Sequence, residues 1–570
     1  MKRIYIFLSM LPVGLSAQSF TEIQTGMNNF YYSAADVADI DNNGTLDIVF
    51  NGAIDSDGDG NVDTSYNEVY QNNGSSWSGY ADLGSYATHL GDIRFIDYNN
   101  DGLPDIISTG LSYMDIVNYK HYRFKNTGTG FVKEETLPGK VYGSMEVFDF
   151  NHDGKPDYAI NGAQYINGAG FKNTLDLYQN TGQDFDQIGN WMEGTQNGSF
   201  KVVDLNNDHL LDLVIIGADV NGGPVSKVYI NQAGVLTHTQ DLKPLASGKI
   251  DVADFNADGF QDLVIVGKDE NDDGYFAVLM NDGTGTFSTQ VFDGHDMSDV
   301  SISTGDLNND GYYDFIISGN KNYNAFVKTY VYDRVGQEFT EGSATGIYAL
   351  GGPGLVQLFD FNNDHHLDVL LGGFDWADPG MPSLTRLFQN TSAEVNLKPM
   401  PPAQLNLTRN GNRFNFTWSG ASDDKTPVNT LRYEIKVGSA PGAKDIAQYV
   451  VTTPSWFLDL DPSVQNIYWS VRSIDASKVY SDESIQGTLG TKDMKPVESL
   501  LAIYPNPASE KVYIKGEKVL EAEMYSMDGR KLDIILNADQ SIDVSHLAKG
   551  IYLLKLKIKN EITTKKLTIK

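Results

Sequence analysis

Seven short segments of the chain carry a repeated arrangement of oxygen-bearing side chains that could bind a metal ion. In each nine-residue segment the first, third, fifth and ninth positions are aspartate or asparagine, as in the segment from Asp39 to Asp47. Alternate residues of a tight loop point their oxygens at one centre, glycine at the sixth position permits a positive φ, and the seventh residue can offer its carbonyl. An all-oxygen shell of flexible size suits Ca²⁺ better than Mg²⁺ or zinc.

The predicted metal ligands fall into seven sets of four, with an eighth set in an insertion. The seven sets are Asp39, Asp41, Asn43 and Asp47; Asp97, Asn99, Asp101 and Asp105; Asp149, Asn151, Asp153 and Asp157; Asp204, Asn206, Asp208 and Asp212; Asp254, Asn256, Asp258 and Asp262; Asp306, Asn308, Asp310 and Asp314; and Asp360, Asn362, Asp364 and Asp368. The eighth is Asp55, Asp57, Asp59 and Asp63. An Asx-rich turn without an ion is the alternative, but its repetition in register favours calcium at seven or eight sites.

The expected role of this calcium is structural. Extracellular calcium modules bind with dissociation constants of roughly 10⁻⁴–10⁻³ M, so at millimolar calcium each site adds on the order of 1 kcal/mol to the stability of the fold. Histidine replaces glycine at the sixth position in two loops, at His209 and His365. Histidine tolerates a left-handed backbone less well than glycine, so these two sites are expected to be weaker.

The acidic loops mark a repeat that predicts an all-β fold. Their first aspartates are 58, 52, 55, 50, 52 and 54 residues apart. A segment of alternating apolar residues precedes each loop, a continuous apolar run follows it, and two further short strand-like segments come next. Four strands in each repeat are typical of a β-propeller blade. Residues 19–395 are therefore expected to form a seven-bladed β-propeller. The seventh repeat lacks a fourth strand, and the segment beginning at Phe20 is expected to supply it by pairing with residues 386–390, which removes an exposed edge.

Composition narrows the possible partners and chemistry. Residues 19–396 hold 55 Asp and Glu against 17 Lys and Arg, within a chain of net charge −33. Binding a nucleic-acid backbone requires the opposite charge, so DNA and RNA are not expected partners. The chain has no cysteine, which excludes disulfides, thiolate metal sites and a cysteine nucleophile. We expect a monomer.

The first 18 residues are predicted to be an export signal. Lys2 and Arg3 precede an apolar run from Ile4 to Leu15, followed by small residues. The run is shorter than the ~20 residues that cross a bilayer, and no other segment of the sequence is expected to cross one.

The loops and their spacing resemble the FG-GAP/VCBS repeats known from integrin α subunits, over residues 19–395. The resemblance implies calcium between the first and second strands of each blade, and adhesion or ligand binding as the role. Related repeats also occur beside bacterial polysaccharide lyases, which leaves an enzyme alternative open.

Two further domains are expected after a Pro-rich linker at 396–404. Residues 405–490 read as seven short strands, with Trp418 in an early strand and Tyr468 placed like a tyrosine corner, and resemble a fibronectin type III β-sandwich; its expected role is a spacer. Residues 498–570 read as a small C-terminal β-sandwich and resemble the type A sorting domain of Bacteroidota type IX secretion. That resemblance implies recognition by the type IX machinery and a product secreted or held at the outer-membrane surface.

The expected function is non-catalytic binding of an extracellular glycan or protein ligand. Aromatic residues gather at the end of the predicted ring opposite the acidic loops, where they could stack on sugars or anchor a protein; alternatively they pack the tops of the blades. These candidates are Tyr86, Tyr113, Tyr165, Trp191 and Trp376. No HExxH, GxSxG or phosphate-loop motif occurs. A lyase-like polysaccharide-degrading enzyme and a purely structural surface scaffold are the alternatives.

Overall fold

The computed structural model describes residues 18–54, 62–74, 76–112, 119–166, 168, 170–182, 184–378, 380–464, 466–486, 501–516, 518–526, 530–558 and 561–570. Within these ranges the regular structure is all β, apart from one 3₁₀ turn, η1 (Gly84–Tyr86). The chain divides into two compact units, Met1–Thr488 and Leu489–Lys570. The predicted export signal, residues 1–18, falls outside the described residues except for Gln18.

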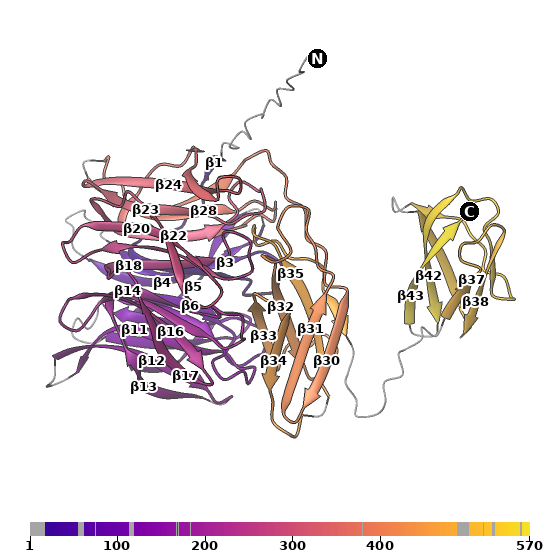
Figure 1. Cartoon of the computed structure of the whole chain (residues 1–570), viewed down its shortest axis with the longest axis horizontal. Helices are drawn as coiled ribbons and strands as arrows, with labels where there is room; N and C mark the ends of the chain where they lie inside the picture. Colours follow the sequence, from indigo (N-terminus) through magenta and orange to yellow (C-terminus); the bar gives the residue numbers. More distant parts are fainter. Residues whose placement is uncertain are drawn as a thin grey trace, which may run out of the picture. The chain divides into compact units, whose positions relative to one another are not determined.

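Seven sheets follow one another along the first unit, and we number them in chain order (Figure 1). The first holds β2 (Tyr31–Ala38), β3 (Asp47–Ile54), β4 (Thr64–Asn72) and β5 (Trp77–Asp82), and the second β6 (His89–Ile96), β7 (Asp105–Leu111), β8 (Tyr119–Asn126) and β9 (Phe131–Pro138). The third holds β10 (Met145–Phe148), β11 (Asp157–Ile166), β12 (Gly170–Asn180) and β13 (Phe185–Glu193), and the fourth β14 (Gln196–Val203), β15 (Asp212–Ala218), β16 (Pro224–Gln232) and β17 (Val235–Asp241).

The remaining three sheets repeat this order. The fifth holds β18 (Ala246–Ala253), β19 (Asp262–Lys268), β20 (Gly274–Asn281) and β21 (Phe287–Phe292), and the sixth β22 (Met297–Gly305), β23 (Asp314–Lys321), β24 (Asn324–Asp333) and β25 (Glu338–Glu341). The seventh combines β27 (Gly351–Phe359), β28 (Asp368–Phe374) and β29 (Ser383–Asn390) with β1 (Gln18–Ile23) and β26 (Ala344–Thr345). In each of the seven, successive strands of the repeat are hydrogen-bonded neighbours.

The seven sheets close into a ring. Their first strands contact one another in order, from β2 through β6, β10, β14, β18 and β22 to β27, and β27 contacts β2 again. The N-terminal strand β1 pairs antiparallel with β29, with Phe20 opposite Asn390 and Ile23 opposite Leu387. The predicted pairing of the Phe20 segment with residues 386–390 is therefore confirmed, and the two ends of the ring are joined in one sheet.

The core lies between neighbouring sheets. The second strand of each sheet is buried on both faces, which explains why these strands read as continuous apolar runs rather than alternating ones. In β15, for example, Leu213, Val214 and Ile216 have no exposed surface. The cluster that joins the first and seventh sheets includes Phe30, Phe50, Leu370 and Leu387.

A two-sheet sandwich follows the ring in the same unit. One sheet has the order β30 (Gln404–Asn410), β31 (Arg413–Ser419), β34 (Ser455–Asp459). The other has the order β33 (Ala447–Val451), β32 (Arg432–Gly438), β35 (Tyr468–Ile474), β36 (Ser484–Gln486). The segment predicted as a linker is held by this sandwich, because Asn396 Nδ2 donates to Asp475 at 2.7 Å and Met400 N donates to the carbonyl of Ser422 at 2.7 Å.

The sandwich lies directly against the ring (Figure 1). Asp459 N donates to the carbonyl of His152 at 2.8 Å, and Asp306 N donates to the carbonyl of Ala476 at 3.0 Å. The short linker turns back, and these hydrogen bonds seat the domain on the ring, so the domain expected to be a spacer is in direct contact with the ring.

The second unit is a small sandwich of its own. Its sheets have the orders β37 (Leu501–Tyr504), β38 (Lys511–Gly516), β41 (Ser541–Asp543) and β40 (Lys531–Leu532), β39 (Glu521–Ser526), β42 (Gly550–Ile558), β43 (Glu561–Ile569). Val512, Met524, Leu554 and Leu567 form its core. Across the described parts of the whole chain, no helix has the length and apolar character needed to traverse a membrane.

Candidate metal centres

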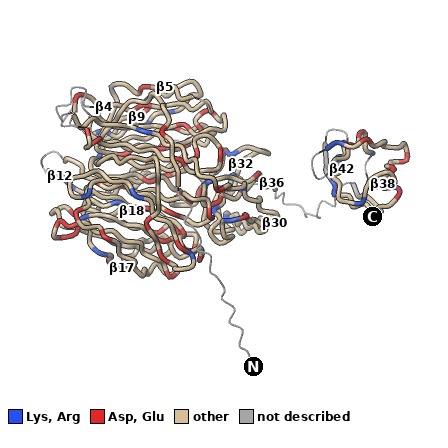
Figure 2. The backbone as a smooth tube through the Cα atoms, turned by 90° about the horizontal axis from the view of Figure 1, so that it is seen from above, with Lys and Arg blue, Asp and Glu red and all other residues tan. Residues whose placement is uncertain are grey.

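All seven acidic loops connect the first strand of a sheet to its second. The ninth-position aspartate is the first residue of the second strand in every sheet, from Asp47 in β3 to Asp368 in β28. Because the sheets are arranged around a ring, the seven loops gather at one of its ends. Figure 2 shows how much more frequent acidic residues are than basic ones over this part of the molecule.

The first-position carboxylate is oriented by the backbone of its own loop. Asp39 Oδ1 accepts a hydrogen bond from Asn43 N at 3.0 Å, and Asp39 Oδ2 accepts one from Gly44 N at 2.9 Å. The first of these bonds measures 3.0–3.2 Å in the other six loops. The same geometry is thus built seven times, with His209 N and His365 N taking the place of the glycine N–H.

Two residues of each loop have a left-handed backbone. The sixth position has a positive φ in every loop, including His209 (68°) and His365 (69°), as predicted. The fourth position was not predicted to, but it also does, at Asn42, Asn100, His152, Asn207, Ala257, Asn309 and Asn363. The signal was present in the sequence, because asparagine tolerates this conformation well and occupies five of the seven fourth positions.

The ninth-position carboxylates are completely buried. All seven, Asp47, Asp105, Asp157, Asp212, Asp262, Asp314 and Asp368, have no exposed surface. One oxygen of each accepts a backbone N–H from the end of the third strand, at 2.7–3.1 Å. In six loops the other oxygen accepts the second-position N–H, as from Ile40 to Asp47 at 2.9 Å.

Burial raises the pKa of these carboxyl groups. The pKa rises to about 6 at Asp47, to about 7 at Asp157, and to about 8 at Asp262, in each case chiefly through desolvation. Neighbouring aspartates of the same loop raise the pKa of Asp262 further, whereas the backbone hydrogen bonds oppose the shift. Among the described residues, no lysine or arginine forms an ion pair with any ninth-position carboxylate.

This donor set fits a hard divalent cation. In the first loop Asp39, Asp41 and Asp47 each offer a carboxylate oxygen within 4.8 Å of the other two. Each buried ninth-position oxygen takes a single N–H and so keeps a lone pair for a ligand bond. Carboxylate and carbonyl oxygens are the ligands Ca²⁺ prefers, and a buried carboxylate without a cationic partner is costly. In the insertion, Asp55, Asp57 and Asp59 lie outside the described residues, so the eighth site stays a prediction.

Asparagine side chains connect most of the loops to the next loop around the ring. The fourth-position amide donates to the sixth-position carbonyl of the following loop in five of the seven joints, as from Asn42 to Gly102 at 3.2 Å and from Asn363 to Gly44 at 2.9 Å. His152 and Ala257 take this position in the other two loops. A second set, at the ends of third strands, reaches back to the previous sheet, as from Asn126 to the carbonyl of Ile40 at 3.1 Å.

The sandwich sits on this acidic end and touches the loops themselves. Thr430 Oγ1 donates to Asp254 Oδ2, a first-position carboxylate, at 3.1 Å. Ser477 Oγ donates to Asn309 Oδ1 at 2.8 Å, and Ser455 Oγ lies 3.0 Å from His209 Nε2. Loop geometry and domain seating therefore depend on each other.

The predicted aromatic residues differ in their surroundings. Tyr86 lies in η1 with its ring 5.5 Å from that of Tyr122. Tyr86 nevertheless stays 37% exposed. Trp191 lies in β13, with its ring 6.1 Å from Phe148 and 5.1 Å from Phe150. Trp191 thus follows the alternative in which the aromatics pack on the blades.

Tyr165 and Trp376 remain open to solvent, at 44% and 38% exposed, while Tyr113 lies outside the described residues. The indole of Trp376 lies against Gly351, the first residue of β27. A Cβ added to Gly351 would lie only 2.2 Å from the indole Nε1. Among the described residues, Tyr86, Tyr165 and Trp376 are thus the predicted aromatics that a ligand could still reach.

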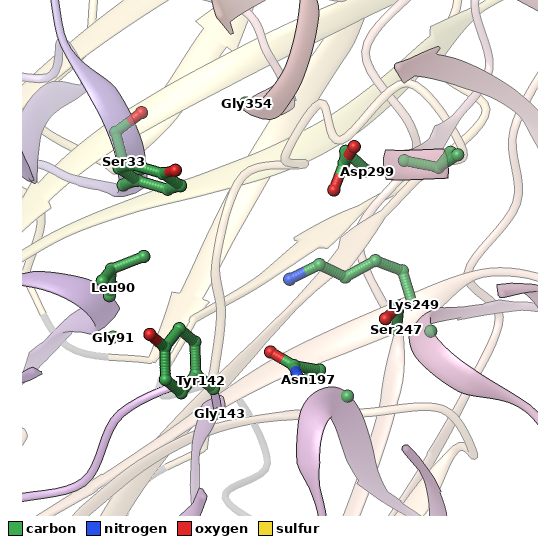
Figure 3. Close-up of a pocket in the computed structure, with 14 residues that line it drawn as sticks. Ser33, Leu90, Gly91, Tyr142, Gly143, Asn197, Ser247, Lys249, Asp299 and Gly354 are labelled. Atoms are coloured by element: carbon green, nitrogen blue, oxygen red, sulfur yellow. The ribbon is translucent and has the colours of Figure 1, made fainter. Parts of the chain in front are cut away.

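A pocket that the sequence did not predict opens on the ring axis. It has a volume of about 180 Å³ and is lined by residues at the starts of the first strands, which is the end opposite the acidic loops. Figure 3 shows the Lys249 side chain extended across it, with Asp299 and Tyr142 on either side. These residues come from three different sheets, and nothing in their local sequence marks them as neighbours.

Comparison with known families identifies two parts of the chain. Residues 502–570 match the secretion system C-terminal sorting domain, and residues 97–160, 254–317 and 306–371 match the FG-GAP-like repeat. No curated protein matches the chain. The sorting domain indicates export by type IX secretion to the cell surface or extracellular space, as in Bacteroidota.

The similar solved structures share only a distant likeness. The fungal lectin of Aleuria aurantia, described as a six-bladed β-propeller that recognises fucose, is 10% identical, with a TM-score of 0.34, over 57% of this chain and 99% of the lectin. The GH93 α-L-arabinofuranosidase of Fusarium graminearum is 8% identical, with a TM-score of 0.36, over 65% of this chain and 97% of that enzyme.

Proposed function

We propose that this protein is an exported, calcium-stabilised binding module whose ring is a seven-bladed β-propeller, and that it holds an extracellular glycan or protein ligand without catalysis. The observation that carries the calcium assignment is the sevenfold repetition of one hydrogen-bonded acidic loop, with a buried carboxylate that has no cationic partner in the part of the chain that the structure describes. The FG-GAP-like repeats and the sorting domain support a role outside the cell.

The bound ions would supply positive charge at the end of the ring where the chain lacks it. Each loop contains three aspartates, so one Ca²⁺ reduces its charge from −3 to −1. The first-, third-, fifth- and ninth-position oxygens would hold the ion, with the seventh-position carbonyl. At the five joints where an asparagine amide ties one loop to the next, a loop held in its bound shape also holds the joint between two sheets.

The two C-terminal sandwiches complete this assignment. We interpret residues 405–490 as a fibronectin type III-like domain, because its three- and four-stranded sheets have the strand order of that fold. Its contacts with the acidic loops give it a role in holding the ring rather than in spacing. The C-terminal unit directs export and engages the type IX machinery.

The enzyme alternative has one observation in its favour. A polysaccharide lyase needs a proton-abstracting group and a charge-neutralising group in one cleft, and Tyr142 and Lys249 both line the axial pocket. Incubation with uronate polymers decides between the two functions. Unsaturated oligosaccharide products, lost in a Tyr142→Phe variant, would establish the lyase, whereas their absence supports binding alone.

A glycan array probed with the mature chain, with and without calcium, tests the binding function. We expect retention of a defined set of glycans in calcium and its loss in chelator. If a parallel panel of extracellular proteins and the array both showed no ligand in calcium, the purely structural scaffold would replace the binding module.

A further inference from the structure

The mouth of the axial pocket is surrounded by strained residues at equivalent positions. Six residues there have a left-handed backbone with φ between 49° and 56°: Tyr32, Leu90, Tyr142, Asn197, Ser247 and Asp299. Five of them lie at a β-bulge where the register of the first strand against the second shifts. Such a conformation costs a residue other than glycine about 1–3 kcal/mol and occurs most often at functional sites.

The backbone of these bulges is fixed by the fold, but their side chains are not. Glycine follows the left-handed residue in four sheets, and a Cβ on Gly91, Gly143 or Gly198 would lie 1.9–2.0 Å from a carbonyl oxygen of the neighbouring strand. The left-handed residue itself varies from tyrosine and leucine to serine and aspartate. The same backbone therefore presents a different side chain from most of the sheets. The fold does not require this set of side chains, which is thus a property of the pocket.

The sandwich contacts the opposite end of the ring. Lys478, in a turn of that domain, donates from Nζ to the carbonyl of Leu358, near the end of β27, at 2.9 Å. Burial lowers the pKa of Lys478 to about 8; the nearby cations Arg432 and Lys201 lower it further, and the carboxylate of Asp251 opposes the shift. The pocket mouth lies at the end of the ring that the sandwich leaves free.

An aromatic platform runs outward from the pocket over the second and third sheets. Tyr142 is 44% exposed at the rim. Burial raises the pKa of Tyr119, and the adjacent phenols of Tyr142 and Tyr165 raise it further. The ring of Phe171, 51% exposed, lies 5.7 Å from that of Tyr119 and 5.5 Å from that of Tyr165. Exposed aromatic rings in a row favour a ligand with successive apolar faces.

We propose that the pocket binds the terminal residue of a neutral oligosaccharide, whose following sugars stack on the platform formed by Tyr142, Tyr119, Phe171 and Tyr165. This proposal rests on the binding function above and names its ligand class. The Asp299 carboxylate can accept hydrogen bonds from two sugar hydroxyls, and the Lys249 ammonium can donate to a ring or hydroxyl oxygen. Residues 19–396 carry far more acidic than basic side chains, which disfavours approach of a polyanion.

Substitution by glycine provides a test that does not confuse binding with folding. Tyr142→Gly removes a side chain where glycine relieves a left-handed backbone, so this variant should melt close to the wild type. Asp299→Gly relieves the same strain but also removes the acceptor of the hydrogen bond that Asn320 Nδ2 donates at 3.2 Å, so its Tm is measured beside its affinity. Tyr323→Gly is the matched control, because Tyr323 also has a left-handed backbone (59°) and is 89% exposed, but is not part of the pocket.

Binding of the mature chain in calcium is measured by titration with neutral oligosaccharides of glucose, mannose, galactose and xylose, with uronate oligosaccharides, and with free amino acids. We expect a neutral oligosaccharide to bind, and Tyr142→Gly and Asp299→Gly each to weaken it about tenfold or more, whereas Tyr323→Gly leaves it unchanged.

Wild-type affinity in both pocket variants would overturn the pocket assignment while leaving the binding function intact. Binding of uronates or amino acids alone, lost in the pocket variants, would overturn the neutral-sugar assignment. Failure of all these probes would overturn the saccharide proposal, and the protein panel described above would then decide whether the binding function survives.

Discussion

Single asparagine side chains determine how the acidic loops are joined. At the ends of third strands, the amide of Asn126 donates to the carbonyl of Ile40 in the previous sheet, and its backbone N–H donates to the buried Asp105. The equivalent Asn231 makes the same backbone bond to Asp212, but its amide donates within its own sheet, to the carbonyl of Leu211. Comparing substitutions of Asn126 and Asn231 therefore separates the stability that the inter-sheet bond contributes from the stability that the bonds within the loop contribute.

We expect Asn126→Ala to destabilise the calcium-loaded chain by about 1–3 kcal/mol, because the carbonyl of Ile40 loses its buried donor. Asn231→Ala, the matched control, should cost about 1 kcal/mol less. Denaturant unfolding monitored by tryptophan fluorescence measures both. Equal losses in the two variants would show that the inter-sheet bond contributes nothing.

Buried neutral histidine gives the ring a defined sensitivity to acid. His121 is 1% exposed with Nε2 3.2 Å from the hydroxyl of Tyr158, and burial lowers its pKa to about 3. Its folded-state pKa is below the unfolded value of about 6.5. Its contribution to stability is therefore complete above pH 6.5 and is lost as the pH falls toward 3.

Between pH 6.5 and 5 the wild type should lose about 1.4 kcal/mol per pH unit more than His121→Gln, since the variant has no proton to take up on unfolding. Parallel unfolding titrations at several pH values, in saturating calcium, give the difference. Identical slopes for the two proteins would mean that His121 is protonated in the folded state.

At the scale of elements, the strand β1 closes the ring. It pairs with β29 across a sequence separation of more than three hundred residues, and Phe20 is 4% exposed in the cluster that joins the sixth and seventh sheets. Without β1, the edge of β29 would be unpaired and available to other chains.

Phe20→Ala should therefore cost about 3–5 kcal/mol. Thr21→Ala, in the same strand but exposed, should change stability by less than about 0.5 kcal/mol. Thermal unfolding and light scattering together measure the loss and any association through the opened edge. A Phe20→Ala variant as stable as Thr21→Ala would contradict closure by this strand.

Repetition made the loops and the strand order predictable from the sequence. Seven copies of one pattern fixed the position of each first-to-second connection, the positive φ at Gly44 and His209, and the pairing of β1 with β29. A repeated pattern shows the structure that lies within one unit, so it also indicated the apolar second strand of each sheet. These predictions needed only local geometry and the period of the pattern.

Features that arise between repeats were not predictable in this way. Trp191 packs against Phe148 and Phe150 because the strand β13 extends through it. The left-handed residues that include Tyr142 and Asp299 have no shared residue type, and the pocket exists only once the ring has closed. The seating of the sandwich depends on scattered contacts such as that of Thr430 with Asp254, which no sequence period records.

At the scale of the whole molecule, the acidic end of the ring is where the proposed calcium sites, the inter-sheet amides and the sandwich meet. Ring and sandwich form one compact unit, and the sorting domain forms another. Because the sandwich contacts the loops themselves, we expect calcium in the loops to stabilise both parts of the first unit together.

Calorimetric unfolding of the mature chain should accordingly show two transitions. One is the ring with its sandwich, whose midpoint rises with calcium, and the other is the sorting domain, whose midpoint does not. Separate transitions for ring and sandwich, with only the former responding to calcium, would show that the seating observed here contributes little stability.

Calcium titration of chelator-treated mature chain tests the central claim most directly. We predict heat of uptake at several sites, a rise in Tm that reflects on the order of 1 kcal/mol for each filled loop at millimolar calcium, and a smaller uptake in Asp262→Asn, where a buried ligand is lost. Absence of both heat and any rise in Tm, with Asp262→Asn indistinguishable from the wild type, would contradict the account.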